Sequence, residues 1–171
     1  MTRTACGAAP TGTATTPRSL HSQILTPPFV VVSACFAAFF ALGAAGVPPL
    51  DNWPIPARGA LAVMFLFTAS ARLTPARADL VAMVPRSLPR PGALVAATGV
   101  LEAAGAVGLL VPATATPAAW CLAGLLVAMF PANVNAARAG VGMRGAAPTP
   151  IPVRLAQQAV YLGLAVVAAA T

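Results

Sequence analysis

Five apolar runs of membrane-spanning length dominate this chain, and proline-rich turns or arginine-bearing loops separate them. They cover residues 29–47, 58–73, 92–111, 117–137 and 152–170. A helix needs about 20 apolar residues to cross the hydrocarbon core of a bilayer, where no water is present to satisfy backbone polar groups. Only 8% of the residues are charged, against about 25% in soluble domains. The sequence therefore predicts an all-α fold, a transmembrane helical bundle over residues 29–171.

Residues 1–28 precede the first apolar run and are rich in threonine, proline, alanine and glycine. Such a composition buries little apolar surface, so we expect a disordered tail. An alternative is that the run 29–47 is a secretory signal cleaved near Ala41-Leu42-Gly43, where small residues occur. The length of the run is closer to that of a retained spanning helix than to that of a usual signal core.

Arginine is distributed unevenly among the loops, and the chain contains no lysine. The tail and the segments 72–90 and 138–154 contain arginines, whereas the 48–57 and 113–116 loops contain none. Arginine concentrates in cytoplasmic loops, so we expect the amino terminus and both basic segments to be cytoplasmic in a bacterial inner membrane. Arg58 runs against this pattern, because it begins the second run at the opposite side. The arginines form no basic stripe with polar or aromatic partners, which argues against nucleic acid as a partner.

The first basic segment contains two further features. Arg72 ends the second apolar run and is expected to extend towards the membrane surface, as arginines near helix ends often do. Residues 76–83 have the pattern of a short amphipathic helix, and we expect it to lie on the bilayer.

Glu102 lies near the middle of the apolar run 92–111 and is the strongest indication of a functional site. An acidic residue at the centre of a spanning helix costs about 2.5–3.5 kcal/mol on insertion scales. We expect its carboxyl group to be neutral unless a cation or hydrogen-bond donors compensate for its burial. Glu102 could serve as a proton relay or a polar contact to a quinone, or it could simply hold helices together by a hydrogen bond.

Other polar residues fall at a similar depth or nearer the cytoplasm. Asn133 follows Pro131 in the fourth run. Pro131 either kinks the helix so that a ligand site forms beside it, or only marks the end of the span. In the last run, Arg154, Gln157 and Tyr161 share one face of a helix. We predict a polar file, that is, a row of polar side chains that runs from the cytoplasmic end of the bundle to its middle. Tyr161 and Glu102 lie at its bottom, near the middle of the membrane. Its mouth, at the cytoplasmic end, is formed by Arg72, Arg154, Asn133 and Gln157. The alternative is that Arg154 contacts lipid phosphates and the glutamines join helices.

From Arg58 onward, over roughly two thirds of its length, the chain resembles the DoxX-like membrane proteins. The residues that carry the resemblance are Ala78-Asp79-Leu80-Val81-Ala82-Met83-Val84-Pro85, Leu88-Pro89, Thr98-Gly99-Val100-Leu101-Glu102, Gly108-Leu109-Leu110-Val111-Pro112, Phe130-Pro131-Ala132-Asn133-Val134 and Arg154-Leu155-Ala156-Gln157. The resemblance implies a four-helix membrane bundle, here preceded by an additional helix over 29–47. Where such proteins often have His-Phe, this sequence has Arg72-Leu73, and arginine cannot act as a neutral metal ligand or as a proton shuttle.

Relatives in that family include subunits of quinone-linked sulfur oxidoreductases and of a membrane complex tied to oxidative stress. The resemblance therefore implies a small membrane subunit of a redox complex, with a redox protein as partner, quinone as a possible cofactor and no independent catalytic activity. A bundle that binds or transports a small lipophilic molecule is one alternative, and a structural membrane partner is another. His21 has no partner for a metal site, and Cys6, Cys35 and Cys121 form no metal-binding or disulfide motif.

Overall fold

A computed structural model describes residues 26–170 except 49 and 51, and in this part of the chain all regular structure is helical. The helices are α2 (Pro27–Ala44), α3 (Pro54–Ala71), α4 (Arg77–Met83), α5 (Pro91–Leu110), α6 (Ala115–Arg138) and α7 (Ile151–Ala169). All except α4 are long and apolar enough to cross a membrane. The predicted all-α class is therefore confirmed, and five helices have the length and composition of the predicted spans. Almost all of the predicted tail, and with it Cys6 and His21, lies outside the described residues.

Proline in the first turn marks the start of four of these helices, α2, α3, α5 and α7. The N–H groups of a first turn have no partner inside the helix, and proline already has a helical φ, so it fits there without loss. The second span consequently begins at Pro54 and includes Pro56, which the sequence analysis had assigned to the preceding turn. Proline also occurs inside α6, which continues from Pro131 to Arg138.

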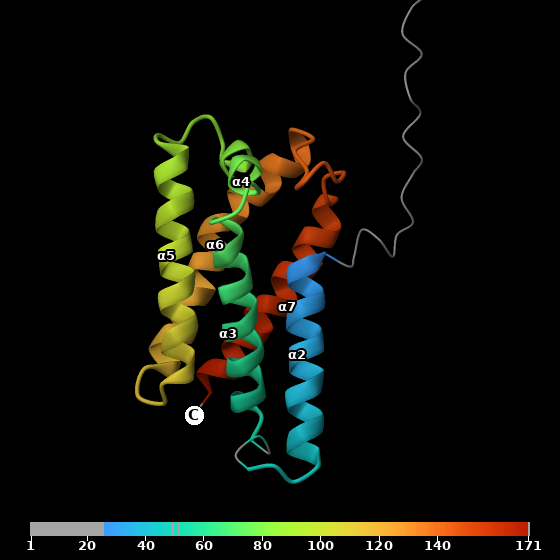
Figure 1. Ribbon diagram of the computed structural model, residues 1–171, viewed down its shortest axis with the longest axis vertical. Coiled ribbons are helices and arrows are strands. Elements are labelled where there is room, and N and C mark those ends of the chain that lie inside the picture. The colour runs from blue at the N-terminus through green and yellow to red at the C-terminus, as the bar shows by residue number, and fades with distance from the viewer. Residues whose placement is uncertain (1–25, 49, 51, 171) are drawn as a thin grey trace, which may run out of the picture.

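Four helices form a ring in which each contacts two neighbours: α3 packs on α5, α5 on α6, α6 on α7, and α7 on α3 (Figure 1). Helix α2 lies outside this ring and packs against α3. Small residues permit the close approach of two pairs of helices, since a Cβ atom on Gly59 would meet the ring of Phe39, and one on Gly105 would meet the side chain of Leu122. The architecture is thus a four-helix core with one additional helix.

The two ends of the bundle differ in structure. The first residue of α2, helix α4 and the segment 139–150 lie at one end, called the α4 end below (Figure 1). The α2–α3 turn, the α5–α6 loop and the last residue of α7 lie at the other end, called the far end. The amide of Asn135 donates a hydrogen bond to the Met83 carbonyl (2.9 Å), and the Arg144 backbone N–H donates to the Asp79 carboxylate (2.7 Å). The predicted amphipathic helix is therefore present as α4, and contacts to α5, α6 and the following loop hold it against the bundle.

Candidate functional site

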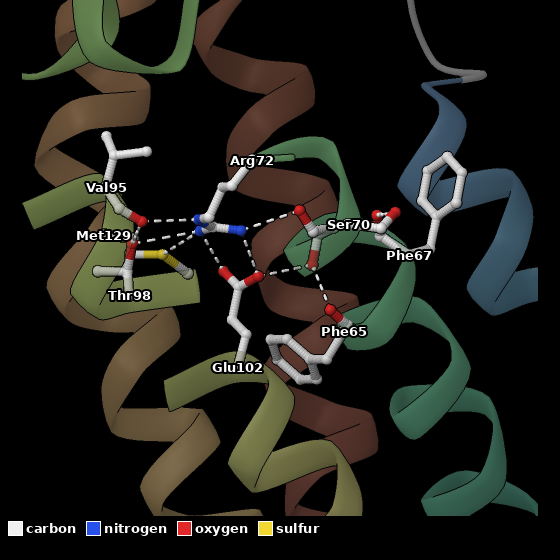
Figure 2. A network of polar contacts seen from close by, with 9 residues as sticks. Phe65, Phe67, Ser70, Arg72, Val95, Thr98, Glu102 and Met129 are labelled. Atoms are coloured by element: carbon white, nitrogen blue, oxygen red, sulfur yellow. Dashed lines mark hydrogen bonds and ion pairs between the residues drawn. The ribbon is translucent and has the colours of Figure 1, made fainter. Parts of the chain in front are cut away.

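Arg72 and Glu102 form a two-pronged ion pair inside the bundle (Figure 2). Nη1 of Arg72 lies 2.7 Å from Oε2 of Glu102, and Nη2 lies 2.8 Å from Oε1. Arg72 is the residue that caps the carboxyl end of α3, and Glu102 lies near the middle of α5. The side chains are only 11% and 2% exposed, respectively. The pair therefore joins two neighbouring helices of the ring in a setting with little access from outside.

Every N–H donor of the Arg72 guanidinium faces a protein acceptor. Besides the two bonds to Glu102, Nε donates to the Val95 carbonyl (2.9 Å), Nη1 to the Thr68 carbonyl (2.9 Å) and Nη2 to the Thr98 hydroxyl (3.2 Å). These oxygen acceptors belong to α3 and α5, and Nη2 also lies 3.9 Å from Sδ of Met129 on α6. Figure 2 shows the guanidinium enclosed between them. Arg72 thus has no donor left for an additional ligand.

The carboxylate of Glu102 is also well satisfied. Oε2 accepts a second hydrogen bond from the Thr68 hydroxyl (2.8 Å), in addition to the one from Arg72. A buried charge requires both a partner of opposite charge and hydrogen bonds to its remaining lone pairs, and Glu102 has both. The condition under which we expected a charged rather than a neutral carboxyl is therefore met. The geometry is that of an ionised pair.

Arg72 does not extend to the membrane surface as the sequence analysis expected, but turns into the bundle. The physical reason is the buried carboxylate of Glu102, which would remain uncompensated without a cation. Gly99, one turn before Glu102, leaves the necessary room: a Cβ atom there would collide with Cδ of Arg72. The sequence separates the two charged residues by thirty positions, so only the packing of α3 against α5 reveals the pair.

The other predicted site residues form contacts of their own. Asn133 on α6 accepts a hydrogen bond from Nη1 of Arg154 on α7 (3.1 Å). Nε2 of Gln157 donates to the hydroxyl of Thr26 (2.9 Å), just before α2. The ring of Tyr161 lies 6.4 Å from the ring of Phe29 on α2. These residues join α7 to α6 and to α2, whereas the hydrogen bonds of Glu102 go to α3.

The predicted polar file is thus divided among separate helix contacts. Arg72 is not at its mouth, because its guanidinium is bonded to Glu102 at the expected bottom. The position of each residue along its helix could be read from the sequence, but the rotation of each helix about its own axis could not. That rotation decides which polar groups meet.

One polar contact that the sequence analysis missed involves Arg58. Its Nε donates to the Ala168 carbonyl (2.8 Å) and its Nη2 to the Ala170 carbonyl (3.3 Å), so it caps the carboxyl end of α7. A cation at this position also interacts favourably with the helix dipole. The hydroxyl of Thr116 adds a bond to the Ala169 carbonyl (3.2 Å). The only sign of this role in the sequence was the position of Arg58, which lies at the side where the other arginines are absent.

Comparisons with known proteins give one family. No curated protein and no solved structure matches the chain. The family model described as "Domain of unknown function (DUF8561)" matches residues 60–169. The matched segment begins within α3 and ends with the last residue of α7, so it contains the last two thirds of α3 and all of α5, α6 and α7, and it excludes α2. On this match, the chain belongs to the family DUF8561.

Proposed function

We propose that this protein is a small multi-pass membrane subunit of the DoxX type, and that it acts as a structural partner for another protein of the bacterial inner membrane. The observation that carries the proposal is the closed set of contacts around Arg72 and Glu102. The one ion pair in the described part of the chain uses its donors and acceptors to hold α3 against α5. Such a centre suits a rigid framework.

The arrangement of the helices supports the DoxX-type assignment. That resemblance implies a four-helix core with an additional first helix, and the described helices form a ring of four with α2 packed on α3. The family match covers most of α3 and all of the other three helices of this ring. A redox role, under this proposal, belongs to the partner protein, and the membrane subunit anchors it.

The charges at the two ends support a cytoplasmic α4 end. Five exposed arginines lie in and around α4 and the segment that follows α6, namely Arg77, Arg86, Arg90, Arg138 and Arg144. The far end has exposed Trp53 and Trp120, residues typical of a membrane–water boundary. The proposed orientation places the start of α2 in the cytoplasm and the end of α7 outside.

The same contacts weigh against the two ligand-based alternatives at this position. A quinone oxygen would need a donor from Arg72, and the protein already occupies all of these donors, while a donor group of a ligand would have to reach Glu102, which is only 2% exposed. A proton relay would need an open path to the carboxylate of Glu102, whose two oxygens are bonded to Arg72 and Thr68 and which is only 2% exposed. The ion pair therefore fits a structural role better than a catalytic or transport role.

The test uses the full chain, tagged at its chromosomal locus and purified from native membranes under mild conditions. The double variant Arg72→Met with Glu102→Leu removes both charges. Both threonines keep a partner, since Thr68 also bonds the Phe65 carbonyl and Thr98 bonds the Val95 carbonyl. If the role is structural, wild type and double variant retain the same protein partner in the same stoichiometric amount and rescue a deletion strain equally. A stably folded double variant that fails to rescue the strain, or a wild-type protein that carries quinone and no partner, contradicts the proposal.

A further inference from the structure

Arg58 lines a pocket at the far end of the bundle, away from the ion pair. The pocket has a volume of about 280 Å³, and the residues that line it come from α2, the α2–α3 turn, α3 and the end of α5: Phe39, Leu50, Ile55, Arg58, Gly59, Leu109, Leu110 and Pro112. Every lining residue except Arg58 is apolar or glycine. A cation in an otherwise apolar pocket indicates a ligand that is itself amphipathic.

The guanidinium of Arg58 is fixed in position but not fully used. The carbonyls of Ala168 and Ala170 hold Nε and Nη2. Within the described residues, Nη1 donates to no acceptor, in contrast to the saturated guanidinium of Arg72. Because α7 holds one side of the guanidinium, the remaining donors are oriented in advance for an anion, which lowers the entropy lost on binding.

The depth of the pocket corresponds to that of lipid headgroups. Arg58 follows the first residue of α3 by about 6 Å along the helix axis, and Trp120 follows the first residue of α6 by about 7.5 Å. Trp120 and Trp53 are both more than half exposed and are the only tryptophans in the chain. Exposed tryptophan marks the boundary between hydrocarbon and water, where the phosphate groups of phospholipids lie.

We propose that this pocket binds an anionic phospholipid of the leaflet at the far end, with its phosphate on Arg58 and the start of an acyl chain against Phe39, Leu109 and Leu110. The net negative charge of the lipid complements the guanidinium, and the apolar walls accept the chain. A volume of about 280 Å³ accommodates only part of a lipid, so the rest of its acyl chains remains in the bilayer. This site is independent of the structural role proposed for Arg72 and Glu102.

The experiment measures retained lipid by native mass spectrometry, with the full chain released from nanodiscs of phosphatidylglycerol and phosphatidylcholine in equal amounts and with identical acyl chains. Wild type is expected to retain phosphatidylglycerol preferentially. Arg58→Gln keeps a donor for the α7 carbonyl but removes the charge, and should reduce the preference about tenfold, which corresponds to one charge-assisted hydrogen bond. The matched control Arg77→Gln removes an exposed charge at the α4 end and should leave the preference unchanged.

A second pair of variants tests the pocket without a change of charge. Leu110→Trp fills the pocket from its exposed side, and Leu101→Trp places the same side chain at another exposed position of α5. Only Leu110→Trp should lower the amount of retained lipid. Equal retention of the two lipids by wild type, an equal loss in both arginine variants, or an unchanged Leu110→Trp protein would each overturn the proposal. Should Arg58→Gln fail to fold, the tryptophan pair decides the question.

Discussion

Gly99 on α5 leaves open the space that Cδ of Arg72 occupies on its way to Glu102. The guanidinium beyond that atom is held by hydrogen bonds on all sides, so the side chain of Arg72 cannot easily move away. A glycine one turn before a buried glutamate is therefore part of the ion pair, although it forms no bond with it.

The first prediction is that Gly99→Leu separates Arg72 from Glu102. The new side chain displaces the arginine and leaves a buried carboxylate without its cation, so we expect a loss of about 3–5 kcal/mol in unfolding free energy. Gly163→Ala is the matched control, because a Cβ atom there meets nothing within 4 Å. Unfolding in detergent micelles, followed by circular dichroism, measures both variants. Equal stability of the two proteins would show that the space at Gly99 is not required.

The second prediction concerns the energetic coupling of the pair. Glu102→Leu alone leaves the cation of Arg72 buried and should destabilise the protein by about 3–5 kcal/mol. Adding Arg72→Met should restore most of that loss, because replacement of a whole buried ion pair by apolar residues is often neutral. A double-mutant cycle measures the coupling. Additive losses from the two substitutions would mean that the two side chains do not interact.

The third prediction addresses the contact between α6 and α7. Asn133→Leu removes the acceptor for Nη1 of Arg154, and interhelical hydrogen bonds in membrane proteins contribute about 0.6 kcal/mol on average. We expect a loss of that size in wild type and a smaller one in an Arg154→Gln background, as measured by unfolding in detergent. If the loss is the same in both backgrounds, Asn133 acts through another partner.

The fourth prediction is that the mature protein retains α2. Val32 is fully buried, Thr26 accepts a hydrogen bond from Gln157, and Phe29 contacts Tyr161, so removal of α2 would expose polar groups of α7 to lipid. The intact mass of the purified protein should therefore include residues 27–44. A mass that corresponds to cleavage near residue 43 would instead support a secretory signal.

The fifth prediction tests the orientation in the membrane. Five spans with a cytoplasmic α4 end place the carboxyl terminus outside the cytoplasm. Alkaline phosphatase fused after residue 171 should be active, and the same enzyme fused after residue 88 should be inactive. The reverse activities would invert the proposed orientation.

The sequence alone determined the helices and their number in the described part of the chain. Hydropathy and proline positions are local properties, so the runs around Glu102 and Tyr161 could be assigned to spans and to depths before any contact was known.

Which polar groups meet depends on the packing of the helices against one another. The rotation of a helix about its axis depends on the side chains of its neighbours, and an apolar sequence in a bilayer contains little amphipathic signal to indicate it. For that reason Arg72, expected at the membrane surface, proved to be the partner of Glu102, and Arg58 proved to cap α7. The sequence set the helix on which each charge lies, and the packing of the helices selected its partner.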